Sequence, residues 1–408
     1  MRPYRSPLQR PASNLLFLLF LITVLSVNVW AAGPSPEKPD FQALTKSGFG
    51  HFYSLEYDDA IKDFQKAAEL RPDDPSAANH LLDAYLYRDL NRYDALDTRL
   101  YIKQGFMNSK QVPMDAAAKK QLKDLMDRAV SLSEKRLKSD PRDAQALYDR
   151  GVTEGLRATY MTIVEHSWFG ALRSALAARH DHEDVLKLHP DWVDAKTVVG
   201  AHLYVVGSLT MPAKAMAGIA GIHGDKKRGL EMLDEAGKAR GETSEDARVA
   251  EALFLRREGD FDHGLEVVRT LTRDHPKNFL FALEESNLLQ NSHKNAEAVT
   301  SLKTLLAGCK DGKYPSAHTE LAYLTLGDAY REMNQLQDSL AAYKAAADAA
   351  ASVPDYKQKA LLAAGEVSDM LSRREEAMLD YRTVIAMDGS SEEAGTARKH
   401  LDKPYRGR

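Results

Sequence analysis

The chain has 408 residues, of which 44% are hydrophobic and 28% are charged, and its formal net charge is −4. This composition excludes an intrinsically disordered chain. The mildly acidic balance gives no electrostatic reason to expect a nucleic acid or an anionic membrane surface as partner. Cys309 is the only cysteine, so we expect no internal disulfide.

The N-terminus has the order of a secretory signal peptide. Arg2, Arg5 and Arg10 precede an apolar run over residues 15–29, and small residues follow it. The run is shorter than the roughly 20 residues that a membrane-spanning helix needs, so cleavage after Ala31 is the favoured interpretation. We expect an exported protein in the periplasm of a two-membrane cell. An uncleaved anchor in the inner membrane is the alternative, and a membrane-associated complex is left open.

A pattern of two paired helices begins after this segment. Ala60, Phe64 and Ala67 are spaced by four and three residues, which places them on one face of a helix. Gly48 belongs to the preceding helix, where a missing side chain lets the two helices approach closely. Pro72 cannot continue the second helix and ends it. This spacing resembles the tetratricopeptide repeat, a helix-turn-helix unit of about 34 residues.

The pattern returns four times in succession between about residues 245 and 388. Five copies in one chain predict an all-α fold, and the resemblance implies a tetratricopeptide-like helical-repeat solenoid with a right-handed superhelix. The matching positions of the four later copies are Ala252, Leu255, Gly264, Val268 and Leu271, then Ser286, Leu289, Ala298, Leu302 and Leu305, then Tyr323, Gly327, Tyr330, Ser339, Tyr343 and Ala346, and last Leu361, Gly365, Ala377, Tyr381 and Val384.

The middle of the chain stays helical but departs from the 34-residue spacing. We expect a long amphipathic helix that ends before Pro141, two further long helices of which the second stops at Pro190, and then another helix. A second resemblance covers residues 140–290. It is to a divergent tetratricopeptide family with eukaryotic members linked to inclusion-body clearance and lipid handling and with exported bacterial members, and it implies a repeat scaffold without catalytic residues.

These patterns divide the chain into four parts. They are a signal peptide over 1–31, N-terminal tetratricopeptide-like helices over 32–110, a divergent central block of long helices over 111–244, and a C-terminal array over 245–400.

Histidines and aromatic residues gather in the central block. His182 and His189 share one helical face, but no third ligand and no HExxH order accompanies them, so we expect no metal site. Trp168, Phe169 and Trp192 are interpreted as core anchors rather than as a cage for a ligand.

A Gly-rich segment precedes three cations, Lys226, Lys227 and Arg228, and raises the question of a phosphate-binding loop. Such a loop requires Gly, four residues and Gly-Lys-Ser/Thr after a strand, and both the spacing and the context fail here. Asp225 is instead expected to cap the next helix. The three cations then occupy its first turn, where the helix dipole disfavours positive charge, so a bound anion or acidic partner is weighed against a solvated basic face.

The function expected from these features is non-catalytic. No motif of nucleophilic catalysis occurs, and we expect neither enzymatic activity nor a cofactor. The main hypothesis is a protein-protein interaction scaffold of the bacterial cell envelope that binds a protein or peptide in a concave groove. One alternative is an envelope-transport accessory protein that holds a small ligand or lipid in the central block, and another is an enzyme with its site there. A deep apolar cavity would favour the transport function, whereas filling by Val199, Leu203 and Ile219 would favour the scaffold.

The repeat spacing places three positions of each first helix on the concave face. Two arginines and three amides at successive turns form a donor-rich strip that suits a peptide backbone and an acidic side chain. An ordinary hydrated surface is the alternative. The predicted binding residues are Arg256, Arg257, Asn287, Gln290, Asn291, Asp328 and Arg331.

Overall fold

The computed structural model describes residues 40–102, 111–211, 221–350 and 353–407, together with residues 214 and 218. Every regular element within these ranges is helical, so the prediction of an all-α chain is confirmed. The predicted signal peptide lies outside the described residues. None of the helices described is both long and apolar enough to cross a bilayer.

The helices follow one another along the chain, and a π-helical turn, η3 (Met161–Glu165), lies between α6 and α7. Their bounds are α1 (Phe41–Phe52), α2 (Tyr57–Leu70), α3 (Pro75–Arg92), α4 (Arg99–Ile102), α5 (Ala116–Ser139), α6 (Ala144–Tyr160), α7 (Trp168–Leu188), α8 (Val193–Gly207), α10 (Lys226–Lys238), α11 (Ser244–Glu258), α12 (Phe261–Asp274), α13 (Phe279–Asn291), α14 (Asn295–Lys310), α15 (Thr319–Glu332), α16 (Leu336–Ala349), α17 (Pro354–Met370), α18 (Arg374–Met387) and α19 (Glu392–Asp402).

Five helix pairs form the predicted repeats: α1 with α2, α11 with α12, α13 with α14, α15 with α16, and α17 with α18. In the first and last pairs a glycine of the first helix packs tightly against the second helix. A Cβ atom added to Gly48 would lie 2.4 Å from the ring of Phe64, and one added to Gly365 would lie 2.6 Å from the ring of Tyr381. The glycine therefore makes room for an aromatic ring of the second helix, and the tetratricopeptide-like repeat is confirmed.

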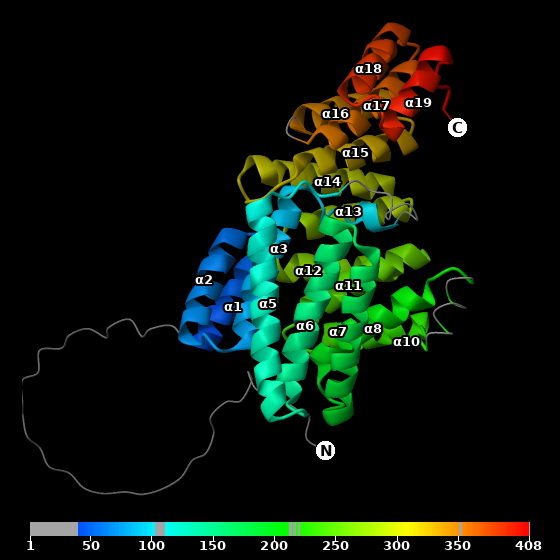
Figure 1. The fold of residues 1–408 in the computed structure, drawn as a ribbon. Helices are drawn as coiled ribbons and strands as arrows, with labels where there is room; N and C mark the ends of the chain where they lie inside the picture. Colours follow the sequence, from blue (N-terminus) through cyan, green and yellow to red (C-terminus); the bar gives the residue numbers. More distant parts are fainter. Residues whose placement is uncertain are drawn as a thin grey trace, which may run out of the picture.

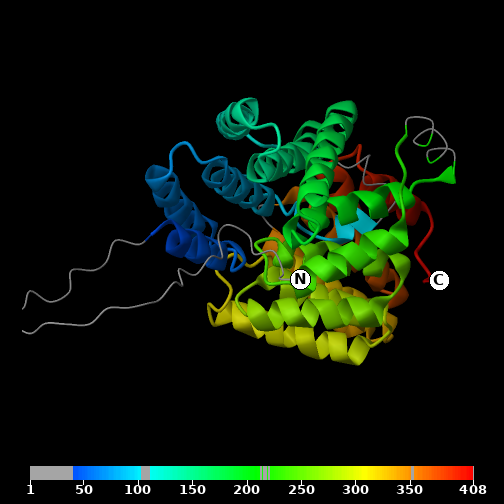
Figure 2. The same ribbon diagram turned by 90° about the horizontal axis from the view of Figure 1, so that it is seen from below.

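The pairs of the C-terminal half stack on one another. Figure 1 shows α11 to α19 rising from the middle of the molecule to its top, while the longer α5, α6 and α7 stand upright beside them. In the view from below, the blue-to-green helices of the first half lie along one side of the yellow and orange helices (Figure 2).

The long helices of the central block begin and end where the sequence indicates. Asp115 caps α5 by accepting a hydrogen bond from Ala118 N, and this helix of 24 residues ends before Pro141. Likewise α7 ends before Pro190. The expectation of irregular, longer helices in the middle of the chain is confirmed.

One of the three aromatic core anchors was wrongly predicted. Trp192 is 3% exposed and stacks on Tyr148 with ring centroids 5.3 Å apart, as a core anchor should, and Trp168 is partly buried. Phe169, in contrast, is 89% exposed. It lies in the first turn of α7, after His166 and Ser167, which interrupt the helix between the π-helical turn and α7, and His166 has a left-handed backbone conformation.

The N-terminal helices share one hydrophobic core with the C-terminal array. Phe52 and Tyr57 belong to the same buried cluster as Phe279 and Leu321. Hydrogen bonds cross the same boundary, because the side chain of Asn278 donates to the backbone oxygen of Tyr53 at 2.8 Å. The N-terminal helices and the array therefore pack as one body.

Candidate functional site

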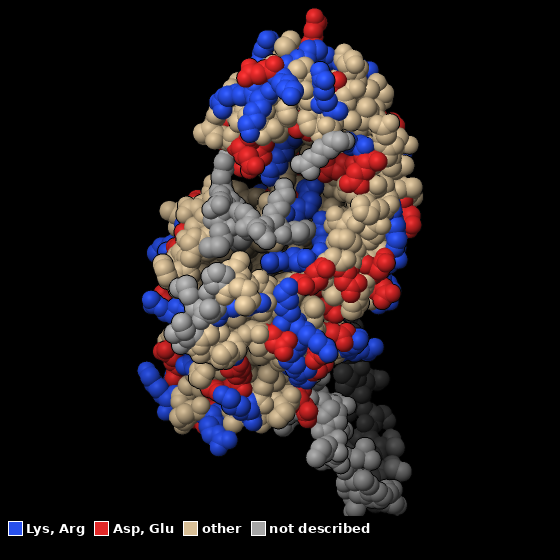
Figure 3. Space-filling model, turned by 90° about the vertical axis from the view of Figure 1, so that its right-hand side faces the viewer, with Lys and Arg blue, Asp and Glu red and all other residues tan. Residues whose placement is uncertain are grey.

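A groove with a volume of about 1190 Å³ runs along the array on the side formed by the first helices of the pairs. Figure 3 views the molecule from this side and shows a hollow with Lys and Arg side chains in its depth and carboxylates beside it. The groove is lined from α11 by Arg256, from α13 by Gln290 and Asn291, from α15 by Leu324, Asp328, Arg331 and Glu332, from α17 by Tyr356, Lys359, Ala363, Glu366 and Met370, and also by Asp97, Arg99 and Leu100, by Phe261 and Tyr343, and by Thr396, His400, Tyr405, Arg406 and Gly407.

The structure brings five of the seven predicted binding residues to this groove. Gln290, Asn291 and Arg331 are partly exposed there, and the side chain of Asp328 is exposed. Arg256 also lines the groove but is only 6% exposed. The remaining two are Asn287, which is buried beneath the groove, and Arg257, which is exposed outside its lining.

Arg256 and Asn287 do not offer free donors to the groove, as the predicted donor-rich strip requires, because both lie in a buried polar network. Arg256 donates to Glu284 Oε2 at 2.8 Å and to Asn291 Oδ1 at 2.7 Å. Asn287 donates to the same Glu284 carboxylate at 3.1 Å. A guanidinium and a carboxylate that are both buried stabilise the fold only when their hydrogen bonds are satisfied, and here they are satisfied within the array.

A stretch of the chain's own N-terminal half completes this network. The connection between α3 and α4 enters the groove, where Thr98 Oγ1 accepts from Arg256 at 3.1 Å and donates to Glu284. Arg99 donates to Thr325 Oγ1 at 3.1 Å. The buried Arg256 thus contacts a segment from a distant part of the sequence, residues 97–100, which we call the inserted segment. It consists of the last two residues of the connection and the first two residues of α4.

Asp97 binds the inserted segment to α17, at a second point of the groove. It accepts from the hydroxyl of Tyr356 on α17 at 2.9 Å and from Arg99 Nε at 3.0 Å. Burial opposes the charge on Asp97, but Arg99 and its hydrogen bonds hold the pKa of this carboxyl below its usual value. The carboxylate is therefore ionised at neutral pH. Nothing in the sequence around Asp97 indicates that it is inserted, because the segment has neither a repeat position nor a known binding motif.

Beyond the inserted segment the groove offers charged groups of both signs. Arg331 donates to Glu366 at 2.9 Å and to the hydroxyl of Tyr405, in the C-terminal tail, at 2.6 Å. The ammonium group of Lys359 lies 4.9 Å from the ring centroid of Tyr356. The exposed Asp328 accepts from the hydroxyl of Tyr343 at 2.6 Å. Such alternating donors and acceptors along an elongated hollow fit a peptide backbone with charged side chains.

The second predicted site lies at the start of α10. Asp225 caps this helix as predicted, by accepting from Arg228 N at 3.0 Å. The cations face carboxylates, since Lys226 Nζ lies 2.7 Å from Glu258 and Arg228 Nη1 lies 3.1 Å from Glu235. Lys227 is the most exposed of the three and lies 3.9 Å from Glu231. These ion pairs explain how a cationic first turn is tolerated, and they favour a solvated basic face over an anion site.

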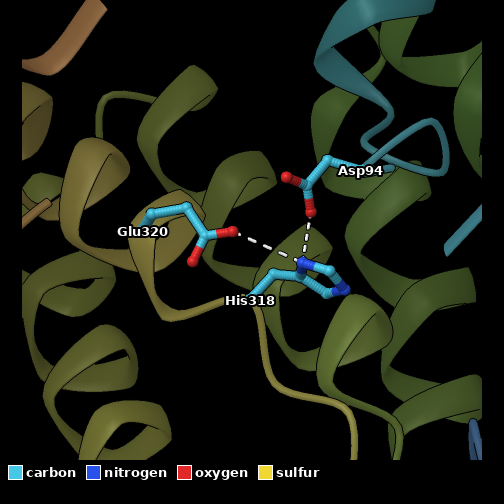
Figure 4. Close-up of side chains that lie close together, drawn as sticks. All are labelled: Asp94, His318 and Glu320. Carbon is cyan, nitrogen blue, oxygen red and sulfur yellow. Dashed lines mark hydrogen bonds and ion pairs between the residues drawn. The ribbon is translucent and has the colours of Figure 1, made fainter. Parts of the chain in front are cut away.

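A cluster of one histidine and two carboxylates joins the N-terminal helices to the array (Figure 4). Nδ1 of His318, at the start of α15, contacts Asp94 from the connection after α3 and lies 3.3 Å from Glu320. Among the described residues this is the one group of three that could hold a metal ion. Direct contact between Nδ1 and Asp94 leaves no room for an ion between them. Burial opposes the charge on His318, yet its hydrogen bonds to Asp94 and Glu320 raise its pKa to about 9, so the cluster is a proton-bridged clamp.

The histidines of the central block have a structural role. His182 is fully buried beneath Gly151, and its Nδ1 lies 2.7 Å from the backbone oxygen of Ala178. Burial lowers the pKa of His182 to about 4, so this side chain is neutral. His189 packs edge-on against Trp192 instead, with ring centroids 6.0 Å apart.

The helices that would enclose a ligand in the central block pack directly on each other. A Cβ atom added to Gly229 of α10 would lie 2.6 Å from the backbone oxygen of Gly200 in α8. Val199 is buried and Leu203 partly buried at this contact, and Ile219 lies outside the described residues. Such contact between two backbones leaves no room for a ligand at this crossing, which favours the scaffold over the transport function.

No known family profile matches the chain, and no curated protein matches its sequence. Among solved structures, human IFIT1, a dimer with PPP-AAAA, is similar at 14% identity over 90% of this chain and 86% of that chain, with a TM-score of 0.44. The C-terminal part of a TPR repeat-containing protein from Cytophaga hutchinsonii is similar at 12% identity over 67% of this chain and 94% of that one, with a TM-score of 0.46. Yeast Tom70 is similar at 12% identity over 90% and 88%, with a TM-score of 0.40.

The class of the protein follows from its own helices. Five helix pairs, three of which have a first-helix glycine that faces an aromatic ring of the second helix, make the chain a tetratricopeptide-like helical-repeat protein.

Proposed function

We propose that the protein is a non-catalytic scaffold that binds an extended segment of a partner protein in the groove of its C-terminal array. The observation that carries this proposal is the inserted segment, residues 97–100, whose polar side chains are bound by Arg256 and Tyr356 of the groove. A surface that binds the polar side chains of a short stretch of its own chain has the chemistry to bind a similar stretch of another protein. The part of the groove around Asp328 and Arg331, beside the inserted segment, is where the partner segment would bind.

The proposal includes an envelope location. Its support is the order of cationic, apolar and small residues over 1–31. We expect the mature chain to begin at Ala32 and to be recovered from the periplasm. N-terminal sequencing of that fraction tests this, and an intact Met1 in the membrane fraction would support the inner-membrane anchor instead.

The groove is tested by site-specific photocrosslinking in envelope extracts. A crosslinking residue placed at Asp328, inside the groove, should capture the partner, whereas one at Asp262, on the exposed side of α12, should not. An excess of a synthetic peptide with the sequence of residues 94–102 should reduce the capture at position 328, because it presents the same groups as the inserted segment. Equal capture from both positions, or capture that the peptide does not affect, would contradict binding in the groove.

A further inference from the structure

A second cavity lies outside the groove, where the N-terminal helices, the central block and the array meet. Its volume is about 50 Å³, enough for a few water molecules or for one ammonium or guanidinium group. It is lined from α1 by Phe49, from α3 by Ser76, Asn79, His80 and Asp83, from α6 by Tyr148, Asp149 and Val152, from the connection before α11 by Glu242 and Thr243, and from α11 by Asp246.

The charges around this cavity do not balance. Four carboxylates line it, those of Asp83, Asp149, Glu242 and Asp246. One histidine accompanies them, and none of the described residues of its lining is a lysine or an arginine. The histidine, His80, already contacts Glu242, with Nε2 2.9 Å from Oε1. Even a protonated His80 could pair with only one of the four carboxyl groups.

Two buried atoms of the lining have no hydrogen-bond partner. Asp149 is 1% exposed, and its Oδ1 accepts from Ser76 Oγ at 2.8 Å, but its Oδ2 has none. Nδ1 of His80, a residue 4% exposed, also has none. A buried carboxylate oxygen without a donor costs free energy, so Asp149 Oδ2 indicates that a donor is expected in the cavity.

The electrostatics of the carboxyl groups lead to the same conclusion. Burial raises the pKa of Asp149 to about 7, and the nearby Asp74 and Glu242 raise it further against the hydrogen bonds from Ser76 and Gln145. Burial and the charges of Asp246 and Glu242 also raise the pKa of Asp83. These acids would ionise more readily with a cation beside them, and the fold does not supply one from its own side chains.

We propose that this cavity binds an organic cation with several N–H donors, an alkylammonium or guanidinium group. The carboxylates come from three different elements, and no three of their oxygens lie within the 4.8 Å of one another that a shared metal ion would need. Separate N–H groups of one organic cation reach separated acceptors better than a single ion does. The aromatic rings of Phe49 and Tyr148 add apolar walls on which such a cation packs.

Two sources could supply this cation: a free small amine, or the side chain of a lysine or arginine in a partner protein. Agmatine and putrescine represent the free amines, and N-acetylarginine amide represents the side chain. Titration calorimetry and thermal melting of the full chain should show saturable binding and a raised melting temperature with at least one of the three probes. Binding of only the amines or only the arginine derivative identifies the source.

The variants Asp149→Asn and Asp83→Asn remove one negative charge each and keep the side-chain size. Each should weaken probe binding at least about tenfold while the unliganded protein melts at an equal or higher temperature, because a buried charge is removed. Glu251→Gln is the matched control, since Glu251 is a buried carboxyl of α11 outside the cavity whose pKa is also raised to about 7. It should leave binding unchanged, as should Asp328→Arg in the groove.

The proposal is overturned by any of three results. They are an absence of saturable binding of all three probes to the wild-type chain, full binding by both Asp149→Asn and Asp83→Asn, and binding of Mg²⁺, Ca²⁺ or Zn²⁺ that depends on Asp149 in place of the organic cations. If Asp149→Asn does not fold, Asp83→Asn with the same probes decides. Asp328→Arg separates this site from the groove, because only groove binding should respond to it.

Discussion

The C-terminal array and the central block are both helical, but they are held together by different kinds of contact. In the array one local rule repeats, in which a glycine of the first helix faces a tyrosine of the second, at Gly327 with Tyr343 and at Gly365 with Tyr381. In the central block the close approaches at Gly200 and Gly229, and those at Gly207 and Gly224, are to backbone atoms where α8 meets α10 and the residues before it. A contact that recurs at a fixed spacing can be predicted from the sequence, whereas the backbone contacts of this one helix pair follow no repeat and cannot. The predictions below test that difference.

The largest effect is expected in the central block at Trp192. Its side chain is 3% exposed, stacks on Tyr148 and belongs to a small buried cluster of its own. Trp192→Ala should lower the free energy of unfolding by about 3–5 kcal/mol, because it leaves a cavity that a small cluster cannot refill. Urea unfolding followed by circular dichroism measures this. A loss below about 1 kcal/mol would mean that the block is loosely packed at this point.

Replacing one glycine in each region by alanine compares the central block with the array directly. Gly229→Ala places a Cβ atom 2.6 Å from the backbone oxygen of Gly200, and backbone cannot move aside cheaply. Gly365→Ala meets the ring of Tyr381 at 2.6 Å, and a ring can shift more easily. We expect both to destabilise by about 1–3 kcal/mol, with Gly229→Ala at the upper end.

Helical glycines with open space around them serve as the controls for this pair. A Cβ atom at Gly155 in the central block or at Gly395 near the end of the array meets no atom within 4 Å. Alanine at either position should stabilise by about 0.5–1 kcal/mol, because it removes conformational freedom from the unfolded chain. If Gly365→Ala lowered the free energy of unfolding more than Gly229→Ala, the distinction between a ring contact and a backbone contact would be wrong.

The difference between contacts that are local in the sequence and contacts between distant residues explains what could be predicted from the sequence. The spacing of Gly48 and Phe64, or of Gly365 and Tyr381, is local, so helix pairs and the concave face followed from it. The inserted segment brings Thr98 beside Arg256, which is 158 residues away, and no periodicity encodes that contact. The burial of Arg256 was therefore missed. The acidic cavity was missed for the same reason, since its carboxylates come from elements far apart in the chain.

The joint between the N-terminal helices and the array should be sensitive to pH. The pKa of His318 is raised to about 9 in the folded protein, while an unfolded histidine titrates near 6.5. The clamp with Asp94 and Glu320 is therefore fully present below about pH 6.5 and is lost as the pH rises through about 9, which by linkage amounts to at most about 3 kcal/mol.

This pH dependence is measured by melting the protein from pH 6 to pH 10. His318→Gln should melt at a lower temperature than the wild type at pH 6 and should approach it at pH 10. His263→Gln, a histidine exposed on α12, is the control and should keep the wild-type profile. A His318→Gln profile parallel to that of the wild type would show that the clamp does not titrate in this range.

The smallest effect is expected at Phe169, the aromatic residue that the sequence placed in the core. Its side chain is 89% exposed, and Leu379 on α18 of the array is 65% exposed. Exposed positions change stability little, so Phe169→Ser and Leu379→Ser should each stay within about 0.5 kcal/mol of the wild type. Equal, small effects would show that the exposed faces of the two regions behave alike and that their difference lies in the buried contacts. A clear loss at Phe169 alone would instead mean that this ring packs against the protein in solution.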